Sequence, residues 1–249
     1  MTTRYSLPTE SELSLQSEFA VEHLRSDIVS GAWSPGAKLK MRELLPRYDV
    51  GASPMREALA RLAAEGFVEQ RPQRGVRVPE LSFEELQDLS ATRQIVESEA
   101  VRLAALHGKH AWRDNVVASF SLYERDIREH GKREVDWRTT EPRHHLFHKA
   151  VVSGCPFPML RGICDSIHQR LTRYRLQLNA YRFGPDAAIG EHRIFMEAVL
   201  SGDGHRAKAA AQSHFGLSLS VLETELKSRT LPENAKIDKS APLRSSPLS

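Results

Sequence analysis

The chain has 249 residues, which is enough for two domains that each bury a core of their own. Hydrophobic residues make up 40% and charged residues 27%, as in ordinary soluble proteins, and no apolar run approaches the roughly 20 residues that span a bilayer. The formal net charge is only +3, so overall charge is a weak indication of nucleic-acid binding and its local distribution is more informative.

The N-terminal segment predicts a flexible arm over residues 1–14 and a helix from residue 15 to residue 30. The arm is polar and lacks the apolar segment of a secretion signal, so we expect a cytoplasmic protein. In the helix, apolar residues recur at helical spacing until Gly31 ends the run. These residues are Phe19, Val21, Leu24 and Ile28.

Two short helices are predicted next, separated by a tight turn. The first ends near Tyr48, and the second is expected to begin with Ser53 as N-cap and Pro54 as its first residue. The second helix ends at Gly66. Its buried stripe is expected to consist of Met55, Leu59 and Leu62.

Two short β-like runs then flank a turn at residues 73–75, and they form a basic hairpin. Residues 71–78 contain Arg71, Arg74 and Arg77 and no acidic residue, a composition suited to phosphate contact. Residues 15–79 therefore predict a winged helix-turn-helix domain, which favours a reader of double-stranded DNA.

The remainder of the chain predicts a helical bundle over residues 80–227 and a disordered tail over 228–249. Apolar residues repeat at intervals of three and four, which indicates about six or seven helices and a mainly α fold. Breaks are expected at Gly108 and at residues 131–135, 154–158, 183–190 and 202–204. The two cysteines, Cys155 and Cys164, have no metal-site spacing and are expected to be core thiols.

Four of the eleven histidines stand out as candidate metal ligands. His144 and His148 are four residues apart in a predicted helix and share a face, His192 is expected to open another helix, and His214 lies on the next. Imidazoles from three facing helices can bind zinc, nickel, copper or iron. The alternative is that they are core histidines, since this spacing also occurs by chance. Helical register favours His144 over its neighbour His145.

A family resemblance rests on motifs between Gly31 and Val78. They are G-x-x-x-P-G at 31–36, R-E-L at 42–44, P-M-R-E-A-L at 54–59, L-x-x-E-G-F-V at 62–68, and the R-G-V of the hairpin turn. This segment resembles the winged helix-turn-helix domain of the GntR family of bacterial transcriptional regulators. The helical remainder resembles the ligand-binding FCD domain of the FadR subfamily, and the stretch from His144 to Arg175 is similar to the carbon-starvation regulator (CsiR) group.

The resemblance implies DNA contacts by Arg42, Ser53, Arg56, Arg74 and Gly75. Arg56 would pair with guanine or hold a phosphate, and the wing tip at Arg74–Gly75 would enter the minor groove. Many family members carry a base-reading arginine where this chain has Ala52, so a different operator sequence is expected. The alternative for Arg42 and Arg56 is a solvated helix face with intrahelical acidic partners, Glu43 and Glu57.

The resemblance also implies a divalent metal, zinc or nickel, held by His144, His148, His192 and His214. The family motifs D-x-x-F-H, E-H-x-x-I/F and a distant histidine correspond to residues 144–148, 191–195 and 213–215. His144 stands where the family usually has aspartate. A neutral ligand in place of an anionic one leaves the site more positive, which either favours an anionic effector or weakens metal affinity.

Arg93 and Arg173 are candidate ligands for a small carboxylic acid effector. Arg93 matches the family motif R-x-x-[LIV]-E, in which the arginine can hold a carboxylate, and its alternative role is a surface pair with Glu97. Arg170, Arg173 and Arg175 offer further cations, of which at most two can point inward.

These observations predict a homodimeric regulator, more often a repressor in this family, that reads palindromic double-stranded operator DNA and has no membrane partner. A small organic acid, with the metal, would control its affinity for DNA. One alternative is a metal-dependent enzyme, with Glu191 beside His192 as its base. The other is a DNA-binding nucleoid or adaptor protein whose bundle only dimerises.

Overall fold

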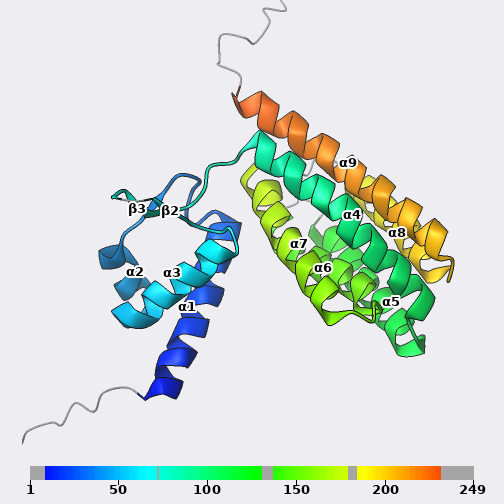
Figure 1. Cartoon of the computed structure of the whole chain (residues 1–249). Coiled ribbons are helices and arrows are strands. Elements are labelled where there is room, and N and C mark those ends of the chain that lie inside the picture. The colour runs from blue at the N-terminus through cyan, green and yellow to red at the C-terminus, as the bar shows by residue number, and fades with distance from the viewer. Residues whose placement is uncertain (1–8, 72, 131–136, 179–183, 231–249) are drawn as a thin grey trace, which may run out of the picture.

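The computed structural model describes residues 9–71, 73–130, 137–178 and 184–230. Within these ranges the chain forms a small N-terminal domain with three helices and a sheet, followed by a bundle of long helices (Figure 1). The predicted fold class, mainly α with a winged helix-turn-helix and an all-helical bundle, is confirmed.

The N-terminal domain packs three helices against one another beside a three-stranded antiparallel sheet. Its strand order is β1-β3-β2, so β3 is central and pairs Arg77 with Lys38 on one side and Glu69 on the other. The elements are α1 (Glu10–Ser30), β1 (Lys38–Leu39), α2 (Met41–Tyr48), α3 (Ala52–Ala64), β2 (Glu69–Arg71) and β3 (Gly75–Arg77).

The first helix is longer than predicted. It begins at Glu10, inside the range predicted as an arm, because Thr9 and Glu12 form a capping box that satisfies the first backbone N–H groups. Phe19 is exposed and stacks on His23, whereas the other predicted apolar residues of this helix are buried. Gly31 ends the helix in the left-handed conformation, as expected of a C-terminal glycine.

The start of α3 also differs from the prediction. Gly51 is the N-cap, with extended backbone angles and a carbonyl that accepts the first helical hydrogen bond from Met55. Ser53 is therefore the second helical residue, not the cap, and Pro54 is the third. Proline is tolerated there because the N–H groups of the first turn have no partner within the helix. The predicted buried stripe, Met55, Leu59 and Leu62, is confirmed.

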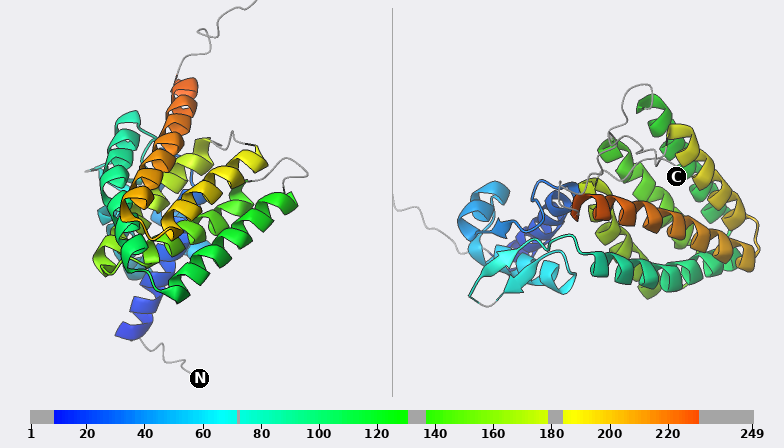
Figure 2. Two further views of the ribbon diagram at one scale, coloured as in Figure 1. Left: turned by 90° about the vertical axis from the view of Figure 1, so that its right-hand side faces the viewer. Right: turned by 90° about the horizontal axis from the view of Figure 1, so that it is seen from above.

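The bundle contains six helices in the described part of the chain, within the predicted range of six to seven. In Figure 2 the two longest, α4 and α9, run side by side along one flank of the bundle, with the others packed beneath them. The helices are α4 (Phe83–His107), α5 (His110–His130), α6 (Trp137–Ser153), α7 (Pro158–Leu178), α8 (Pro185–Leu200) and α9 (Gly204–Thr230).

Two helix boundaries in the bundle correct the prediction. The α8 helix begins at Pro185, in a range predicted as a break, because proline suits the first helical position after the N-cap Gly184. His192 consequently lies well inside α8 instead of opening it. The α9 helix extends to Thr230, three residues into the predicted tail. The predicted break at residues 131–135 lies outside the described residues.

A polar junction joins the linker after β3 to the bundle. Glu85, in the first turn of α4, accepts hydrogen bonds from Arg170, Arg173 and Tyr174 of α7 at 2.7, 2.9 and 2.5 Å. Arg173 also donates to the Pro79 carbonyl at 3.1 Å.

The two cysteines are buried and free, as predicted, and burial raises the pKa of the Cys164 thiol to about 12.

Candidate metal centre and nucleic-acid interface

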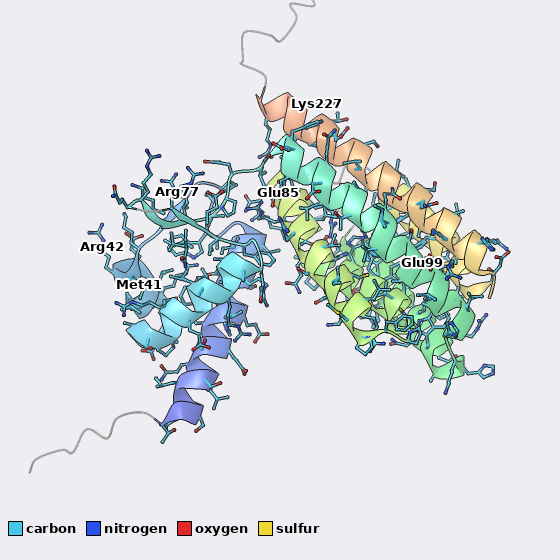
Figure 3. All side chains as sticks on the ribbon, viewed as in Figure 1. Met41, Arg42, Arg77, Glu85, Glu99 and Lys227 are labelled. Carbon is cyan, nitrogen blue, oxygen red and sulfur yellow. The ribbon has the colours of Figure 1, made fainter. Side chains whose placement is uncertain are left out.

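The N-terminal domain exposes most of the residues predicted to contact DNA. The Arg42 side chain is 77% exposed and lies 3.6 Å from Glu43, while Arg56 on α3 is exposed without an ion pair in the described part of the chain. Arg74 and Gly75 are exposed in the turn between β2 and β3, where Gly75 has a φ of 77°. Figure 3 shows Arg42 and Arg77 pointing away from the bundle.

Ser53 lies exposed in the first turn of α3, one residue after the helix begins. The N-cap is Gly51, whose backbone N–H donates to the Gln16 side chain at 3.3 Å. The structure adds two exposed basic residues that the sequence argument missed, Lys38 and Lys40, which flank Leu39 of β1. Lys38 is paired with Arg77 across the sheet, and the signal in the sequence was the short run Lys-Leu-Lys.

Four buried imidazoles meet in the middle of the bundle, and we call His144, His148, His192 and His214 the histidine cluster. The Nε2 atom of His144 lies 3.0 Å from that of His192 and 3.1 Å from that of His148. The Nε2 atoms of His148 and His214 are 3.3 Å apart. The predicted convergence of α6, α8 and α9 is therefore present.

Hydrogen bonds on the far side of three rings fix which nitrogen holds the proton. The Nδ1 atom of His192 lies 2.8 Å from the Ala188 carbonyl oxygen, and Nδ1 of His214 lies 2.5 Å from Glu191 Oε2. The Nδ1 atom of His144 lies 3.4 Å from Glu141 Oε1. Because carbonyl and ionised carboxylate oxygens only accept, each Nδ1 is a donor, and in a neutral ring Nε2 then presents a lone pair.

Burial keeps these rings neutral. It lowers the pKa of His144 and holds the pKa values of His148, His192 and His214 well below their ordinary value. Neighbouring cationic and histidine groups add to the depression for the last three.

The neighbouring His145 is turned elsewhere. Its Nε2 lies 2.9 Å from Asp165, which confirms that the helical register selects His144 for the cluster.

Arg93 and Glu97 form a buried ion pair beside the cluster, not the surface pair considered as an alternative. Their side chains are 3% and 2% exposed, and Arg93 Nε lies 2.7 Å from Glu97 Oε2. The guanidinium also stacks over the Phe215 ring at 3.9 Å. A charge pair so deep in the bundle is costly to desolvate, so the two charges depend on each other.

A cavity of about 250 Å³ opens beside the histidine cluster, and all four of its histidines line it. Two arginines, Arg93 and Arg175, reach it from α4 and α7, together with Tyr123 of α5. Arg175 donates to Glu141 at 2.5 Å, and the pKa of Glu141 ends well below its ordinary value because burial, which opposes ionisation, is outweighed by Arg175.

Arg173 is not part of this cavity, which corrects its assignment as an effector ligand. Its guanidinium is committed to the Pro79 carbonyl and Glu85 at the junction with the linker. The residue two positions later, Arg175, reaches the cavity instead, because α7 presents opposite sides to the linker and to the cluster.

Several residues of the site were missed by sequence reasoning. They surround the cluster as acceptors or lie beside it: Tyr123, Glu141 and Ala188. Glu141 had a signal, since it precedes His144 by three residues on the same helix face. Tyr123 and Ala188 carried none, because their place depends on how the helices pack.

The chain also matches two family models. Residues 16–78 match the model described as bacterial regulatory proteins, gntR family, and residues 88–217 match the model of the FCD domain. No helix in the described ranges has the length and apolar character needed to cross a membrane.

Similar proteins are transcriptional regulators. The chain is 31% identical over 210 residues to the uncharacterised HTH-type transcriptional regulator BphR of Paraburkholderia xenovorans, covering 82% of this chain and 84% of the relative. It is 30% identical over 210 residues to the HTH-type transcriptional repressor GlaR of Escherichia coli, covering 80% and 92%. The E. coli McbR/YncC structure matches with a TM-score of 0.72 and 18% identity over 85% of this chain and 98% of that one.

Proposed function

Since this chain belongs to the GntR family of bacterial regulatory proteins, carries an FCD domain and is a DNA-binding transcriptional regulator, we propose that a small organic acid controls its affinity for operator DNA. The acid would bind in the helical bundle together with a divalent metal held by the histidine cluster. The alternative of an enzyme is not supported, because the relatives and both family models are those of regulators.

The main support for a bound metal is the distance of 3.0 Å between His144 Nε2 and His192 Nε2. Both nitrogens present lone pairs, since both Nδ1 atoms face acceptors, so no hydrogen bond can join them. A cation between them removes this repulsion. Burial lowers the pKa of both histidines, which disfavours a proton in that role.

The chemistry of the donors also fits a metal. Metal-binding histidines usually donate their other N–H group to a carboxylate or a carbonyl, as His214 does to Glu191 and His192 to Ala188. Four neutral imidazoles suit zinc or nickel, and the bound ion would supply an electrophilic centre for an oxygen ligand.

The organic acid is proposed from the charge balance of the cavity. The histidine cluster is neutral, while Arg93 and Arg175 are each matched by a glutamate, Glu97 and Glu141. A divalent ion would therefore bring uncompensated positive charge, which a carboxylate can neutralise while its second oxygen faces an arginine or Tyr123. Histidine in place of the family's usual aspartate at position 144 strengthens this argument.

The DNA-binding part of the proposal rests on exposure and charge. Arg42, Arg56, Ser53 and the Arg74–Gly75 turn would face the operator, with a homodimer reading palindromic half-sites about one helical turn, roughly 34 Å, apart. Repression is proposed because the GlaR relative is named a repressor. The similarity to the carbon-starvation regulator group stays a prediction.

Metal content tests the proposal directly. His192→Ala should lose most of the metal that copurifies with the native protein, measured by elemental analysis, because it removes one of four converging donors. His205→Ala is the matched control, since His205 is exposed on α9 away from the cluster. Equal metal content in the native protein and the His192 variant would rule out this site.

Operator binding tests the role of the acid. Gel-shift titrations with C3–C6 mono- and dicarboxylates, run with and without added zinc, should show weaker DNA binding for at least one acid in the presence of metal. Indifference to every acid would favour a bundle that serves only for dimerisation.

A further inference from the structure

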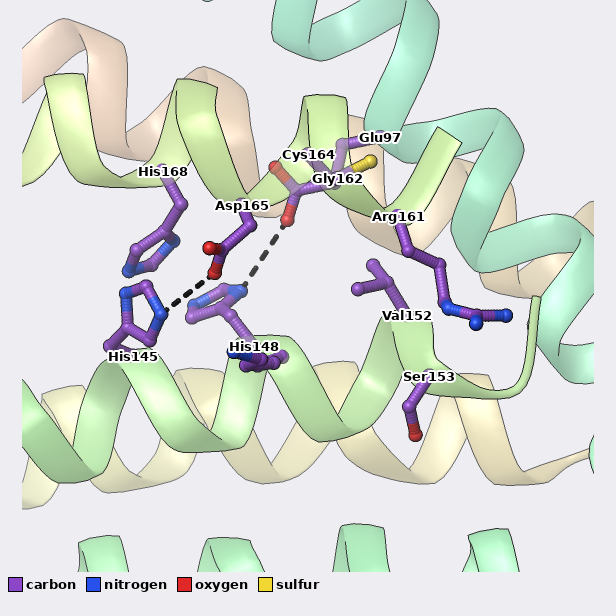
Figure 4. Close-up of a pocket in the computed structure, with 11 residues that line it drawn as sticks. Glu97, His145, His148, Val152, Ser153, Arg161, Gly162, Cys164, Asp165 and His168 are labelled. Carbon is purple, nitrogen blue, oxygen red and sulfur yellow. Dashed lines mark ion pairs between the residues drawn. The ribbon is translucent and has the colours of Figure 1, made fainter. Parts of the chain in front are cut away.

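A second cavity lies on the other side of His148, and among the described residues this is the only one that lines both cavities. It measures about 210 Å³, is partly open to solvent, and is lined by residues of α4, α6 and α7. Figure 4 shows His145, Asp165 and His168 gathered at one end of it, and Arg161 with Ser153 at the other. The metal and the acid proposed to bind at the histidine cluster do not occupy this cavity.

His168 directs an unpaired hydrogen-bond donor into the second cavity. Its side chain is buried, and Arg175 Nη2 lies 3.1 Å from its Nε2. Because arginine only donates, Nε2 is the acceptor, and Nδ1 of the neutral ring bears the hydrogen. This Nδ1 has no hydrogen-bond partner in the described part of the chain, which is a costly state for a buried N–H group.

His148 presents a second donor to the same space. Its Nδ1 also lacks a hydrogen-bond partner in the described ranges, and the nearest acidic oxygen, Glu97 Oε1, is 3.8 Å away. Where Nε2 of this ring faces the metal of the proposed function, Nδ1 bears the hydrogen. Without metal, Nε2 can donate to Nε2 of His144 or His214, and Nδ1 then presents a lone pair to the same space. The rings of His148 and His168 lie 5.1 Å apart, so one small group can meet both.

The polar surroundings of these two donors suit a hydroxyl group. Glu97 and Asp165 also line this cavity, so an anionic group placed here would meet two carboxylates. A hydroxyl has two lone pairs and one hydrogen. With metal bound, it can accept from both imidazole N–H groups and donate to one carboxylate. Without metal, it can accept from His168 Nδ1 and donate to His148 Nδ1, so both unpaired nitrogens gain a partner in either state.

Two basic residues, Lys149 and Arg161, also line the cavity. Lys149 is exposed and forms no ion pair in the described ranges, and Arg161 is half-buried and donates only to the Cys155 carbonyl. Arg161 and His168 are seven residues apart on α7, so the cavity follows the helix for about two turns, roughly 10 Å. A carboxylate at the basic part and a hydroxyl at the histidine end therefore match its length.

We propose that this second cavity binds a short hydroxycarboxylic acid, independently of the acid bound at the metal. A volume of about 210 Å³ and a length of about two helical turns suit a small molecule such as 4-hydroxybutanoate. Because His148 separates the two cavities, the occupant of the second contacts a residue of the metal centre from behind.

The test uses 4-hydroxybutanoate as probe, with butanoate and butane-1,4-diol as analogues that each lack one functional group. Isothermal titration calorimetry on the His192→Ala protein, in which the metal centre is disabled, should show one site per chain. The two analogues should bind at least roughly tenfold more weakly, because each leaves buried polar or charged groups unmatched.

Two substitutions at His168 separate its two nitrogens. The amide of His168→Asn replaces Nδ1 and should retain binding, whereas the amide of His168→Gln replaces Nε2 and should weaken it by roughly tenfold or more. Arg161→Ala should also weaken binding, and Arg206→Ala, with the same charge change on an exposed part of α9, should not. Thermal unfolding of each variant verifies that it is folded.

Three outcomes would overturn the inference. They are equal affinity for butanoate and 4-hydroxybutanoate, unchanged binding in both His168→Gln and Arg161→Ala, and binding to the native protein that disappears in His192→Ala. The last would place the probe at the metal, and it would leave the proposed function intact. Conversely, a native protein without metal would remove the proposed function but not binding at this second cavity.

Discussion

Replacing Glu191 by glutamine tests whether the histidine cluster is a metal centre built with supporting hydrogen bonds. Glu191 Oε2 lies 2.5 Å from His214 Nδ1 and 3.6 Å from His192 Nδ1, so one carboxylate faces two proposed ligands. Glutamine keeps the shape of the glutamate side chain but removes its negative charge. That charge makes both imidazoles stronger electron-pair donors to a metal. The change leaves all four proposed ligands in place.

The expected loss of metal affinity follows from the exposure of this side chain. Substitution of such a supporting partner typically costs about 10–100-fold in metal affinity, which is roughly 1.4–2.7 kcal/mol. The Glu191 side chain is 30% exposed, so water can replace part of the lost hydrogen bond. We therefore expect a loss near the lower end, about tenfold.

Competition between the protein and a chromophoric chelator for zinc measures this affinity. Glu197→Gln is the matched control, because Glu197 is exposed on the same helix. A change of less than about twofold for Glu191→Gln, or an equal change in the control, would refute the assignment of Glu191 as a supporting partner.

Three further predictions concern DNA binding, stability and pH. Arg56→Ala should weaken operator binding by about 1–3 kcal/mol in a gel-shift titration, whereas Arg206→Ala should leave it unchanged. Glu97→Gln should lower the free energy of unfolding in urea by about 3–5 kcal/mol, because it leaves the Arg93 charge buried without its partner; a loss below about 1 kcal/mol would show that water reaches the pair. In metal-free protein, the free energy of unfolding should fall as the pH drops from about 7.5 to 5.5. The unfolded chain binds protons at the ordinary histidine pKa of 6.5, while burial keeps the histidine cluster neutral in the folded state, and a flat profile would contradict this.

The features that the sequence predicted well depend on local periodicity or on spacing. The stripe of Met55, Leu59 and Leu62 follows from helical periodicity alone, and so does the shared face of His144 and His148. The prediction that His192 and His214 lie close to His144 and His148 did not follow from spacing along the chain. It came from the family resemblance, which supplied the packing of the helices.

The predictions that were wrong concern features that periodicity does not determine, namely helix caps and the placement of side chains. The α1 helix begins at Glu10 and not at the predicted residue 15. A capping box at Thr9 stabilises its first turn, which has few apolar residues and so gave no periodic signal. Ser53 was a plausible cap by residue type, but the backbone of Gly51 already adopts the cap conformation two residues earlier. The second cavity had no sequence signal, since its unpaired donors arise from the placement of Arg175 and Glu97 relative to two imidazoles.

The contrast between Arg173 and Arg175 bears on how the two ends of the protein are connected. Residues two apart on a helix differ by about 200° in direction. On one side α7 therefore binds Pro79 of the linker and Glu85 of α4, and on the other it binds Glu141 beside the histidine cluster. The Arg173 side chain is only 2% exposed and packed at this junction. If the ligands proposed for the two cavities shift α7, Arg173 would carry that shift directly to Pro79, which follows β3.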